Sequence, residues 1–411
     1  MAMRILIVTL LYAPDDGPSA PLFQMLCEEL VRKGHQVTII AAVPHYPSGQ
    51  VPERFRRGWL QTSEENGVRV IRVRVPSLDR NRLLYRAIQF GVFQLGAALA
   101  SLRQAYDVAL VTNPAIEVFL PFFTSVVLRR KPSVFFVADV YPDVGIQLNI
   151  FRSRIVIKLV ETLERFCLRH ATYTWIFSQS FRIPIARLGV PPERQRLIYS
   201  WINPQAITPL PRNTTFSREF DLDDRFVVLY AGNLGLSQGL DRVLDVAQRL
   251  MDHPQFCFVF VGDGSGKEAL VKQAEARQLT NVRFIPFQPF SRVAEVLATA
   301  DVALLSLQSS IASSSIPSKT FSYLASGRPI IGILDPQSDA ADLIRRSGGG
   351  MVIAPDQIDA LEDVLLEWYR SPELYSEMGA KGRDYVLQYH TSPYAAEQVE
   401  ALLQDAIKAD G

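Results

Sequence analysis

The feature that most constrains the fold of this chain is a regular alternation of short apolar runs with segments of helical periodicity. The apolar runs are rich in Val, Ile, Leu and Phe, as buried strands usually are. Strands that alternate with helices indicate a parallel sheet covered by helices. The predicted strands are 4–9, 36–42, 68–75, 108–112, 134–138 and 172–178 in the first half, and 226–231, 256–261, 282–286, 302–306, 329–334 and 350–353 in the second.

A fresh series of strands begins at residue 226 and divides the chain into two domains. The preceding stretch, 203–224, is rich in Pro, Asn and Thr, and we predict the interdomain linker there. A chain of 411 residues is also too long for one ordinary core. The sequence therefore predicts two α/β domains, 1–203 and 204–390, followed by an amphipathic helix at about 391–411.

The cysteines indicate a reducing compartment, and the first residues lack the pattern of a signal peptide. Cys27, Cys167 and Cys257 stand singly in apolar segments, without the spacing of a zinc site or the even count of a disulfide framework. This usage fits the cytoplasm. Residues 1–11 have a short apolar run but no cleavage site, so we interpret them as a first strand and not as a signal peptide.

Charge is divided unevenly between the two halves. Residues 1–203 carry 25 Lys and Arg against 15 Asp and Glu, whereas residues 204–411 carry 18 against 27. A basic half favours an anionic partner. The sequence has no helix-turn-helix, zinc-finger or RNA-recognition signature, so an anionic membrane leaflet is a better candidate than nucleic acid.

Parts of the basic half have the composition of a membrane-contacting surface. Residues 87–102 carry no charge and are bracketed by Arg86 and Arg103, but they are shorter than the roughly 20 residues that span a bilayer. They form either a core helix or a helix in the membrane interface. Residues 54–59 and 80–86 mix basic and apolar side chains, which suits either a solvated loop or a headgroup boundary. We expect a cytoplasmic protein that is peripheral on the inner face of the cell membrane.

A candidate anion site lies near the end of the second half. Ser313–Ser315 lead through Pro317 and Ser318 to Lys319, and a short apolar helix then runs to Gly327. Small polar residues at a helix N-terminus offer N–H and hydroxyl donors, and a Lys adds a mobile positive charge. The segment could hold a diphosphate, although a surface loop with a solvated Lys has the same composition.

The pattern P-S-K-x-x-x-Y-x-A-x-G-x-P-I over this segment resembles the donor site of the family-4 retaining nucleotide-sugar glycosyltransferases. The resemblance covers nearly the whole chain and is strongest to the bacterial branch that transfers N-acetylated amino sugars in surface-polysaccharide assembly. Each motif is weak alone, but their order is specific. The other landmarks are Y-A-P at 12–14 with Gly17, K-G-H-Q-V at 33–37, P-H-Y-P-S-G at 44–49, D-V-Y-P-D at 139–143, G-N-L-G at 232–235, Q-G at 238–239 and V-G-D-G at 261–264.

The resemblance implies the GT-B architecture, two facing Rossmann-like domains with a C-terminal helix that crosses back to the first. It implies transfer of a sugar, of the N-acetylhexosamine type, from a UDP-sugar to a hydroxyl of a lipid-linked glycan such as a polyprenyl-diphosphate precursor. The acceptor would attack on the face that the leaving group occupies. We expect no metal or other cofactor, because the sequence has no D-x-D motif on a loop after a strand.

The resemblance also assigns donor-binding positions in the second half. Most of the family has Arg and then Lys where Asn233 and Gln238 stand here, and neutral donors bind phosphate more weakly than charged ones. Lys319 therefore becomes the main catalytic candidate, to neutralise the leaving group. Ser318 beside it is a donor-binding candidate. Ser322 replaces the Glu that usually binds ribose. Backbone at Phe287 and Gln288 would meet the base.

The first half supplies candidates for the sugar and the acceptor. Gly17 and its small neighbours would let the chain approach the donor sugar. His45, Tyr46 and Asp143 follow predicted strands, as ligand-binding residues of parallel sheets do, and we assign them to the acceptor. Asp139 could orient the acceptor hydroxyl as a second catalytic residue, or it could cap the following turn.

Other functions have less support. Gly262, Gly264 and Gly266 alternate and lack the G-x-G-x-x-G spacing of a dinucleotide-binding oxidoreductase, and a P-loop is absent. Neither a pyridoxal-phosphate lysine segment nor the paired acids of an epimerase are evident. The alternative that stays open is a non-catalytic nucleotide-sugar-binding or scaffold protein, because Asn233, Gln238 and Ser322 weaken the donor site.

Overall fold

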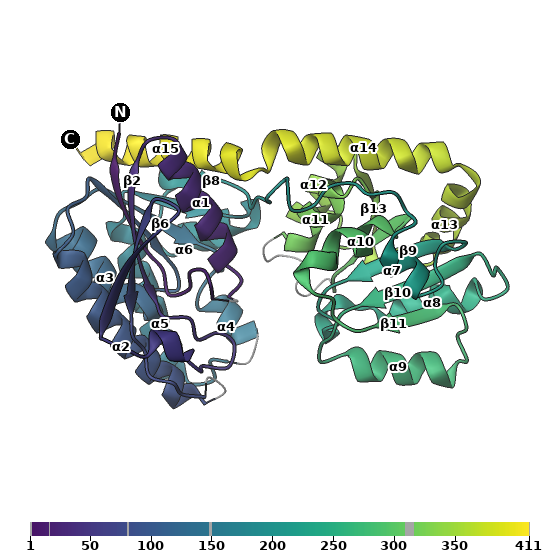
Figure 1. Ribbon diagram of the computed structural model, residues 1–411, viewed down its shortest axis with the longest axis horizontal. Coiled ribbons are helices and arrows are strands. Elements are labelled where there is room, and N and C mark those ends of the chain that lie inside the picture. Colours follow the sequence, from purple (N-terminus) through teal and green to yellow (C-terminus); the bar gives the residue numbers. More distant parts are fainter. Residues whose placement is uncertain (1, 16, 80–81, 148–149, 309–315, 411) are drawn as a thin grey trace. The chain divides into compact units, whose positions relative to one another are not determined.

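The structure is a computed structural model that describes residues 2–15, 17–79, 82–147, 150–308 and 316–410. The chain divides into two units. Unit 1 comprises Met1–Ser200 and Ser392–Gly411, and unit 2 comprises Trp201–Thr391. Figure 1 labels many of the elements of both units, which we describe separately.

Unit 1 is built on an eight-stranded sheet in the order β3-β4-β2-β1-β5-β6-β7-β8. All neighbours pair in parallel except β3 and β4. The strand order reverses direction between β1 and β5, so this is the topological switch point. The strands are β1 (Arg4–Val8), β2 (Gln36–Ala42), β3 (Leu60–Glu65), β4 (Val68–Val73), β5 (Val108–Thr112), β6 (Ser133–Val137), β7 (Tyr173–Ile176) and β8 (Gln195–Leu197).

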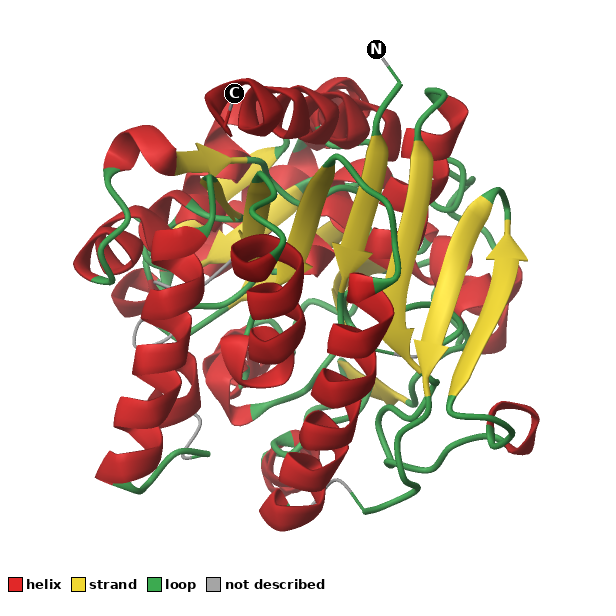
Figure 2. Cartoon of the chain, turned by 90° about the vertical axis from the view of Figure 1, so that its left-hand side faces the viewer, coloured by secondary structure: helices red, strands yellow, loops and turns green. Residues whose placement is uncertain are grey.

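The sequence analysis missed the edge strands β3 and β8. β3 is polar and half-exposed, so it lacks the apolar run that indicates a buried strand. Its turn does carry a signal, since Asn66 and Gly67 both have positive φ, of 52° and 80°, and Asn-Gly is the preferred sequence for a two-residue hairpin. Figure 2 shows this hairpin as two outer strands that run in opposite directions.

Helices cover both faces of the unit 1 sheet (Figures 1 and 2). The C-terminal helix, α15 (Ser392–Asp410), belongs to this unit and packs on α1 and β6, which confirms the predicted return to the first domain. Glu400 of α15 binds Lys33 Nζ at 2.9 Å and His35 Nε2 at 3.1 Å, so the K-G-H motif anchors this helix. The other helices are α1 (Ala20–Arg32), α2 (Leu83–Leu102), α3 (Ala115–Phe122), which continues as a π-helix (Phe123–Leu128), α4 (Asp143–Gln147), α5 (Arg154–His170) and α6 (Arg182–Arg187).

Unit 2 has a six-stranded sheet in the order β11-β10-β9-β12-β13-β14, and every pair is parallel. Its switch point lies between β9 and β12. The strands are β9 (Phe226–Ala231), β10 (Phe256–Val261), β11 (Val282–Ile285), β12 (Val302–Ser306), β13 (Ile330–Ile333) and β14 (Gly350–Ile353). The helices are α7 (Thr215–Glu219), α8 (Asp241–Arg249), α9 (Lys267–Ala276), α10 (Val293–Ala298), α11 (Ser318–Ala325), α12 (Asp339–Ser347), α13 (Ala360–Arg370) and α14 (Pro372–Tyr389).

The segment 203–224, where we predicted a linker, belongs to unit 2 instead. It carries α7, whose Thr214 and Ser217 form a reciprocal capping box. Phe216 and Leu222 are fully buried. The polar composition hid these two anchors, which pack the segment onto the second core.

Candidate active site

The carboxyl ends of β9, β10, β11 and β12 lie along one edge of the unit 2 sheet, where ligands of parallel α/β folds usually bind. The loops after β9 and β10 approach each other so closely that only glycine fits. A Cβ on Gly262 would lie 1.9 Å from the carbonyl oxygen of Gly232. The V-G-D-G motif therefore serves this close approach of two loops, and the loops place Asn233 at the edge of the sheet.

Lys319 lies in the first turn of α11, beside the carboxyl end of β9. Its Nζ donates hydrogen bonds to the hydroxyl of Tyr230 and, at 3.2 Å, to Oε1 of Gln238. The same nitrogen lies 4.0 Å from the centre of the Tyr230 ring. Burial lowers the pKa of Lys319 to about 7, because the ammonium form loses its hydration. Lys319 is thus hydrogen-bonded to the loop and strand beside it, unlike a solvated lysine of a surface loop.

Tyr230 joins Lys319 to the loop after β9. Its hydroxyl lies 2.8 Å from both the carbonyl oxygen of Asn233 and Oε1 of Gln238. Gln238 is fixed on its other side, because Ser306 Oγ donates to its carbonyl oxygen at 2.5 Å. The structure therefore brings Asn233, Gln238 and Lys319 together around Tyr230, a residue that the sequence analysis missed.

The remaining donor candidates lie on α11 and after the edge strand β11. Ser318 begins α11 and is exposed, and Ser322 lies one turn further along the same helix. Phe287 follows β11 and is 73% exposed. Gln288 is tied to its own loop, since its Nε2 donates to the carbonyl of Pro286 and its Oε1 accepts from Arg292. The Ser-rich stretch Ser313–Ser315 lies outside the described residues.

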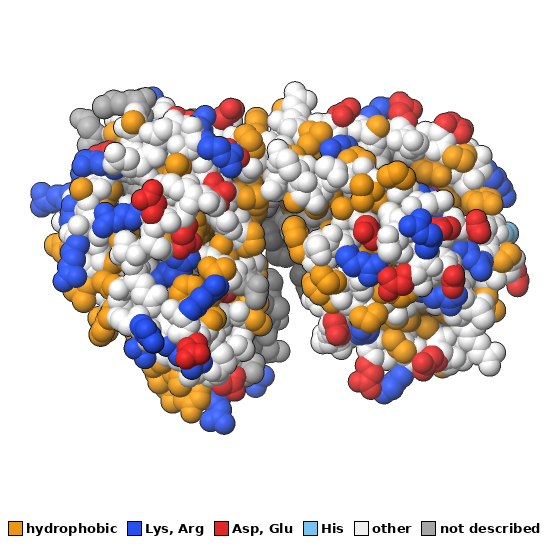
Figure 3. All heavy atoms as spheres, viewed as in Figure 1, with side chains coloured by type: hydrophobic (Ala, Val, Ile, Leu, Met, Phe, Trp, Pro, Cys, Tyr) orange, Lys and Arg blue, Asp and Glu red, His pale blue; other side chains and the backbone are white. Residues whose placement is uncertain are grey.

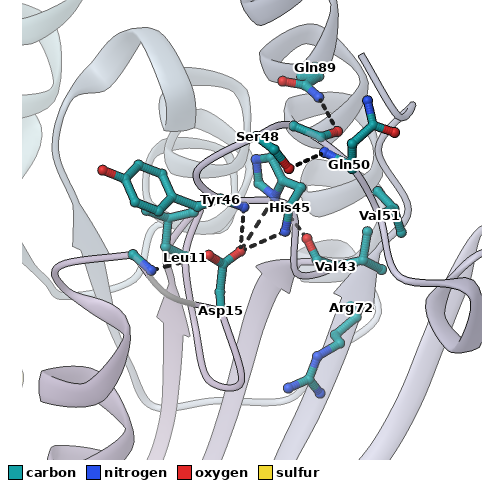
Figure 4. A network of polar contacts seen from close by, with 12 residues as sticks. Leu11, Asp15, Val43, His45, Tyr46, Ser48, Gln50, Val51, Arg72 and Gln89 are labelled. Carbon is teal, nitrogen blue, oxygen red and sulfur yellow. Dashed lines mark hydrogen bonds and ion pairs between the residues drawn. The ribbon is translucent and has the colours of Figure 1, made fainter. Parts of the chain in front are cut away.

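In unit 1, a buried carboxylate joins the loops that follow β1 and β2 (Figure 4). Asp15 accepts hydrogen bonds from the backbone N–H of His45 at 2.9 Å and of Gly17 at 3.2 Å. The Nδ1 of His45 lies 2.8 Å from the carbonyl oxygen of Val43, so this nitrogen carries the proton. The ring of His45 is fully buried, whereas Tyr46 is 36% exposed. A Cβ on Gly17 would lie 2.4 Å from Cδ1 of Leu11, so a larger residue there requires the Leu11 side chain to move.

Asp139 follows β6 on the other side of the switch point, and a buried network holds its backbone. Asn113 Nδ2 donates to the carbonyl of Asp139 at 2.5 Å, and Asn113 Oδ1 accepts from the N–H of Ala138 at 2.9 Å. Glu164 of α5 accepts in turn from Asn113 Nδ2 at 3.1 Å and from the N–H of Ala115 at 2.8 Å. Burial raises the pKa of Asp139, and it raises the pKa of Glu164 to about 7.

The sequence analysis also missed Asn113 and Glu164. Asn113 stands directly after a strand, which is a detectable signal, whereas nothing in the helix 154–170 indicates that Glu164 is buried. Asp143 begins α4 and is exposed. In the part of the chain that the structure describes, no group of three His, Cys, Asp or Glu side chains is arranged to hold a metal ion.

Comparison with known proteins agrees with this geometry. Residues 19–201 match the family described as glycosyl transferase 4-like domain, and residues 212–385 match glycosyl transferases group 1. Escherichia coli WcaI, whose name assigns it to colanic acid biosynthesis as a glycosyl transferase, is 26% identical over 87% of this chain and 90% of its own length. WbjE of Pseudomonas aeruginosa, named as a glycosyltransferase, is 26% identical over 71% of this chain and 74% of its own.

Among solved structures, the Anabaena protein Alr3699/HepE in complex with UDP superimposes with a TM-score of 0.71. It covers 98% of this chain and 100% of that one at 15% identity, which shows the fold alone. The fold and the matched domains define the class: this is a glycosyltransferase of the GT-B fold. The chain belongs to the family of group 1 and 4-like glycosyltransferases, as the ordered motifs predicted.

Proposed function

We propose that this glycosyltransferase moves an N-acetylhexosamine-type sugar from a UDP-sugar to a hydroxyl of a lipid-linked glycan, with retention of configuration. The observation that carries the proposal is the cluster of Lys319, Tyr230 and Gln238 at the switch point of unit 2. Two findings about other proteins support it. Alr3699/HepE binds UDP on the same fold, and WcaI is named for polysaccharide biosynthesis.

The donor diphosphate lies beside Lys319 and the N-terminus of α11. As the bond to the sugar breaks, charge grows on the leaving phosphate, and a fixed cation stabilises it without having to move. Asn233 and Ser318 add neutral hydrogen bonds, and Ser322 faces the ribose. The base contacts Phe287 and Gln288 after β11.

The sugar and the acceptor belong to unit 1. Gly17 lies against the donor sugar, and Asp139 orients the attacking hydroxyl of the acceptor. The raised pKa of Asp139 suits this role, because a less acidic carboxyl is a better proton acceptor. Tyr46 and Asp143 are exposed and contact the acceptor, whereas the buried ring of His45 shapes the loop that presents Tyr46.

The test is a panel of nucleotides and acceptors. UDP should raise the melting temperature of the protein more than ADP or GDP at the same concentration. UDP-N-acetylhexosamines with a lipid-linked diphosphate acceptor should release UDP, and NMR of the product should show the anomeric configuration of the donor. UDP binding without turnover on any acceptor would favour the non-catalytic alternative, and an inverted product would contradict retention.

The surface of unit 1 is consistent with attachment to the inner, anionic leaflet of the cell membrane. α2 exposes Leu83, Leu84 and Leu95 by 62%, 70% and 54%, and Trp59, which lies against Gly96 of this helix, is 57% exposed. α2 is the one helix of the described residues that is long and apolar enough to cross a membrane, although a core helix can pass the same test.

Basic side chains accompany this apolar surface. Figure 3 shows Lys and Arg scattered over the same face of unit 1 as apolar side chains. Basic residues near an anionic leaflet contribute on the order of 1 kcal/mol each. Pelleting with anionic vesicles should therefore exceed pelleting with neutral ones and should fall at high salt. Apolar side chains that insert into the membrane should give binding that survives high salt, and Leu84→Ser together with Trp59→Ser should weaken this binding. Equal, negligible pelleting in all conditions would exclude a membrane partner.

A further inference from the structure

The polar cluster around Lys319 has an unusual charge balance. In the described part of the chain, Lys319 takes part in no ion pair with a carboxylate. Its hydrogen-bond partners are a phenol on β9 and an amide oxygen that follows β9. Tyr323 of α11 also lies at this place, and its hydroxyl donates to the carbonyl of Ala231 and accepts from its N–H. Burial raises the pKa of both phenols, so both stay neutral at pH 7.

Among the described residues, the acceptors of the Lys319 nitrogen are therefore neutral groups. The hydroxyl of Tyr230 accepts a hydrogen bond from Nζ of Lys319, and the centre of the Tyr230 ring lies 4.0 Å from the same nitrogen. Both contacts favour the ammonium form. Burial opposes them and lowers the pKa of Lys319 to about 7. The balance leaves the nitrogen only partly protonated near neutral pH, and an arriving anion favours the protonated form.

We propose that Tyr230 is a positioning residue that holds Nζ of Lys319 for a diphosphate, and that a nucleoside diphosphate binds to unit 2 together with one proton. This inference rests on the proposed function, since it takes UDP as the ligand of this site. The proton comes from the solvent and ends on Nζ, and no other bond forms or breaks. The bound phosphate supplies a negative partner for the ammonium group, which raises the pKa of Lys319 in the complex.

Proton uptake can be measured without an acceptor or a known donor sugar. Titration calorimetry with UDP in two buffers of different ionisation enthalpy gives the number of protons taken up. The terminal phosphate of UDP has a pKa of about 6, so it is ionised at pH 8 and contributes little. The wild-type protein should take up about half a proton per UDP at pH 7 and nearly one at pH 8, and its affinity should fall about fivefold between these pH values.

Variants separate the two parts of the proposal. Lys319→Arg keeps a charge that cannot be lost, so UDP should bind with no proton uptake at either pH. Tyr230→Phe keeps the ring but removes one hydrogen-bond acceptor of the Lys319 ammonium group. The pH at which UDP affinity begins to fall should therefore be lower than in the wild type. Uptake at pH 7 should then exceed that of the wild type. Lys272→Met, an exposed lysine of α9, is the matched control and should behave as the wild type.

The outcomes distinguish this inference from the proposed function. UDP binding with the same heat in both buffers at pH 8 would overturn the proton linkage and leave the nucleotide site intact. Uptake that persists in Lys319→Arg would assign the proton to another group and overturn it as well. If Tyr230→Phe leaves the midpoint of the pH dependence of UDP affinity unchanged or raises it, the positioning role of Tyr230 is refuted. No binding of UDP at all would instead refute the proposed function and, with it, this inference.

Discussion

Glu164 offers a sharp test of the buried network beneath Asp139. The side chain is 1% exposed, and its carboxyl accepts from Asn113 and from the N–H of Ala115. Burial raises its pKa from an ordinary value of 4.5 to about 7, and these two hydrogen bonds offset only part of the shift. Glu164→Gln replaces the carboxyl by a neutral group of the same size.

The magnitude follows from the pKa shift. A carboxyl whose pKa is higher in the folded state contributes its full stability below pH 4.5, and this stability is lost as the pH rises through 7. With 1.36 kcal/mol per pKa unit, the loss is about 3 kcal/mol at pH 8 and about 1 kcal/mol at pH 5. Glu164→Gln removes this dependence, so between pH 5 and pH 8 the variant should gain about 2 kcal/mol of unfolding free energy relative to the wild type.

Urea denaturation at the two pH values, followed by circular dichroism, measures this difference. The matched control is Glu161→Gln on the same helix, whose carboxyl pairs with Arg165 near the surface. Because exposed helical pairs are worth only about 0.3–0.5 kcal/mol, the control should change little with pH. If Glu164→Gln differs from the wild type by the same amount at pH 5 and pH 8, Glu164 is not a buried, partly protonated carboxyl.

Three further predictions concern the reaction. Turnover should persist in EDTA, and loss of activity that Mg²⁺ or Mn²⁺ restores would contradict a metal-independent mechanism. Asp139→Asn should lower turnover by about 10²–10⁴-fold, the range of a lost acid–base group, while the Kd for UDP stays within about twofold of the wild type; unchanged turnover would remove Asp139 from the reaction. Asn233→Arg and Ser322→Glu restore residues that are common in the family and should keep or tighten UDP binding in calorimetry, whereas loss of binding would show that this site is arranged differently.

Much of the fold was predictable because buried parallel strands leave long apolar runs in a sequence. β2, β5, β9, β10, β12 and β14 have the predicted bounds. The segment 203–224 was misjudged because two aromatic or aliphatic anchors inside a polar stretch decide its packing. The edge strand β3 was missed because an exposed strand needs no apolar alternation, although the Asn66-Gly67 turn could have revealed it.

The site was predictable only in part, for a physical reason. Lys319, Asn233 and Gln238 belong to local motifs, so a sequence shows them. Tyr230 lies 89 positions from Lys319 in the sequence, and only the parallel sheet brings the two together. The lowered pKa of Lys319 and the raised pKa of Glu164 likewise depend on burial, which a sequence does not display.

The most direct test of the account is acceptor-dependent release of UDP by the wild type and by Lys319→Ala. UDP-N-acetylhexosamine and a lipid-linked diphosphate acceptor are the substrates, and Lys272→Ala is the control. Loss of one preorganised donor to developing charge costs about 10²–10³ in turnover, or about 2.7–4 kcal/mol. The account predicts a fall of this size in Lys319→Ala, with nucleotide binding weakened far less. Wild-type turnover in Lys319→Ala would contradict the central claim that this lysine stabilises the leaving diphosphate.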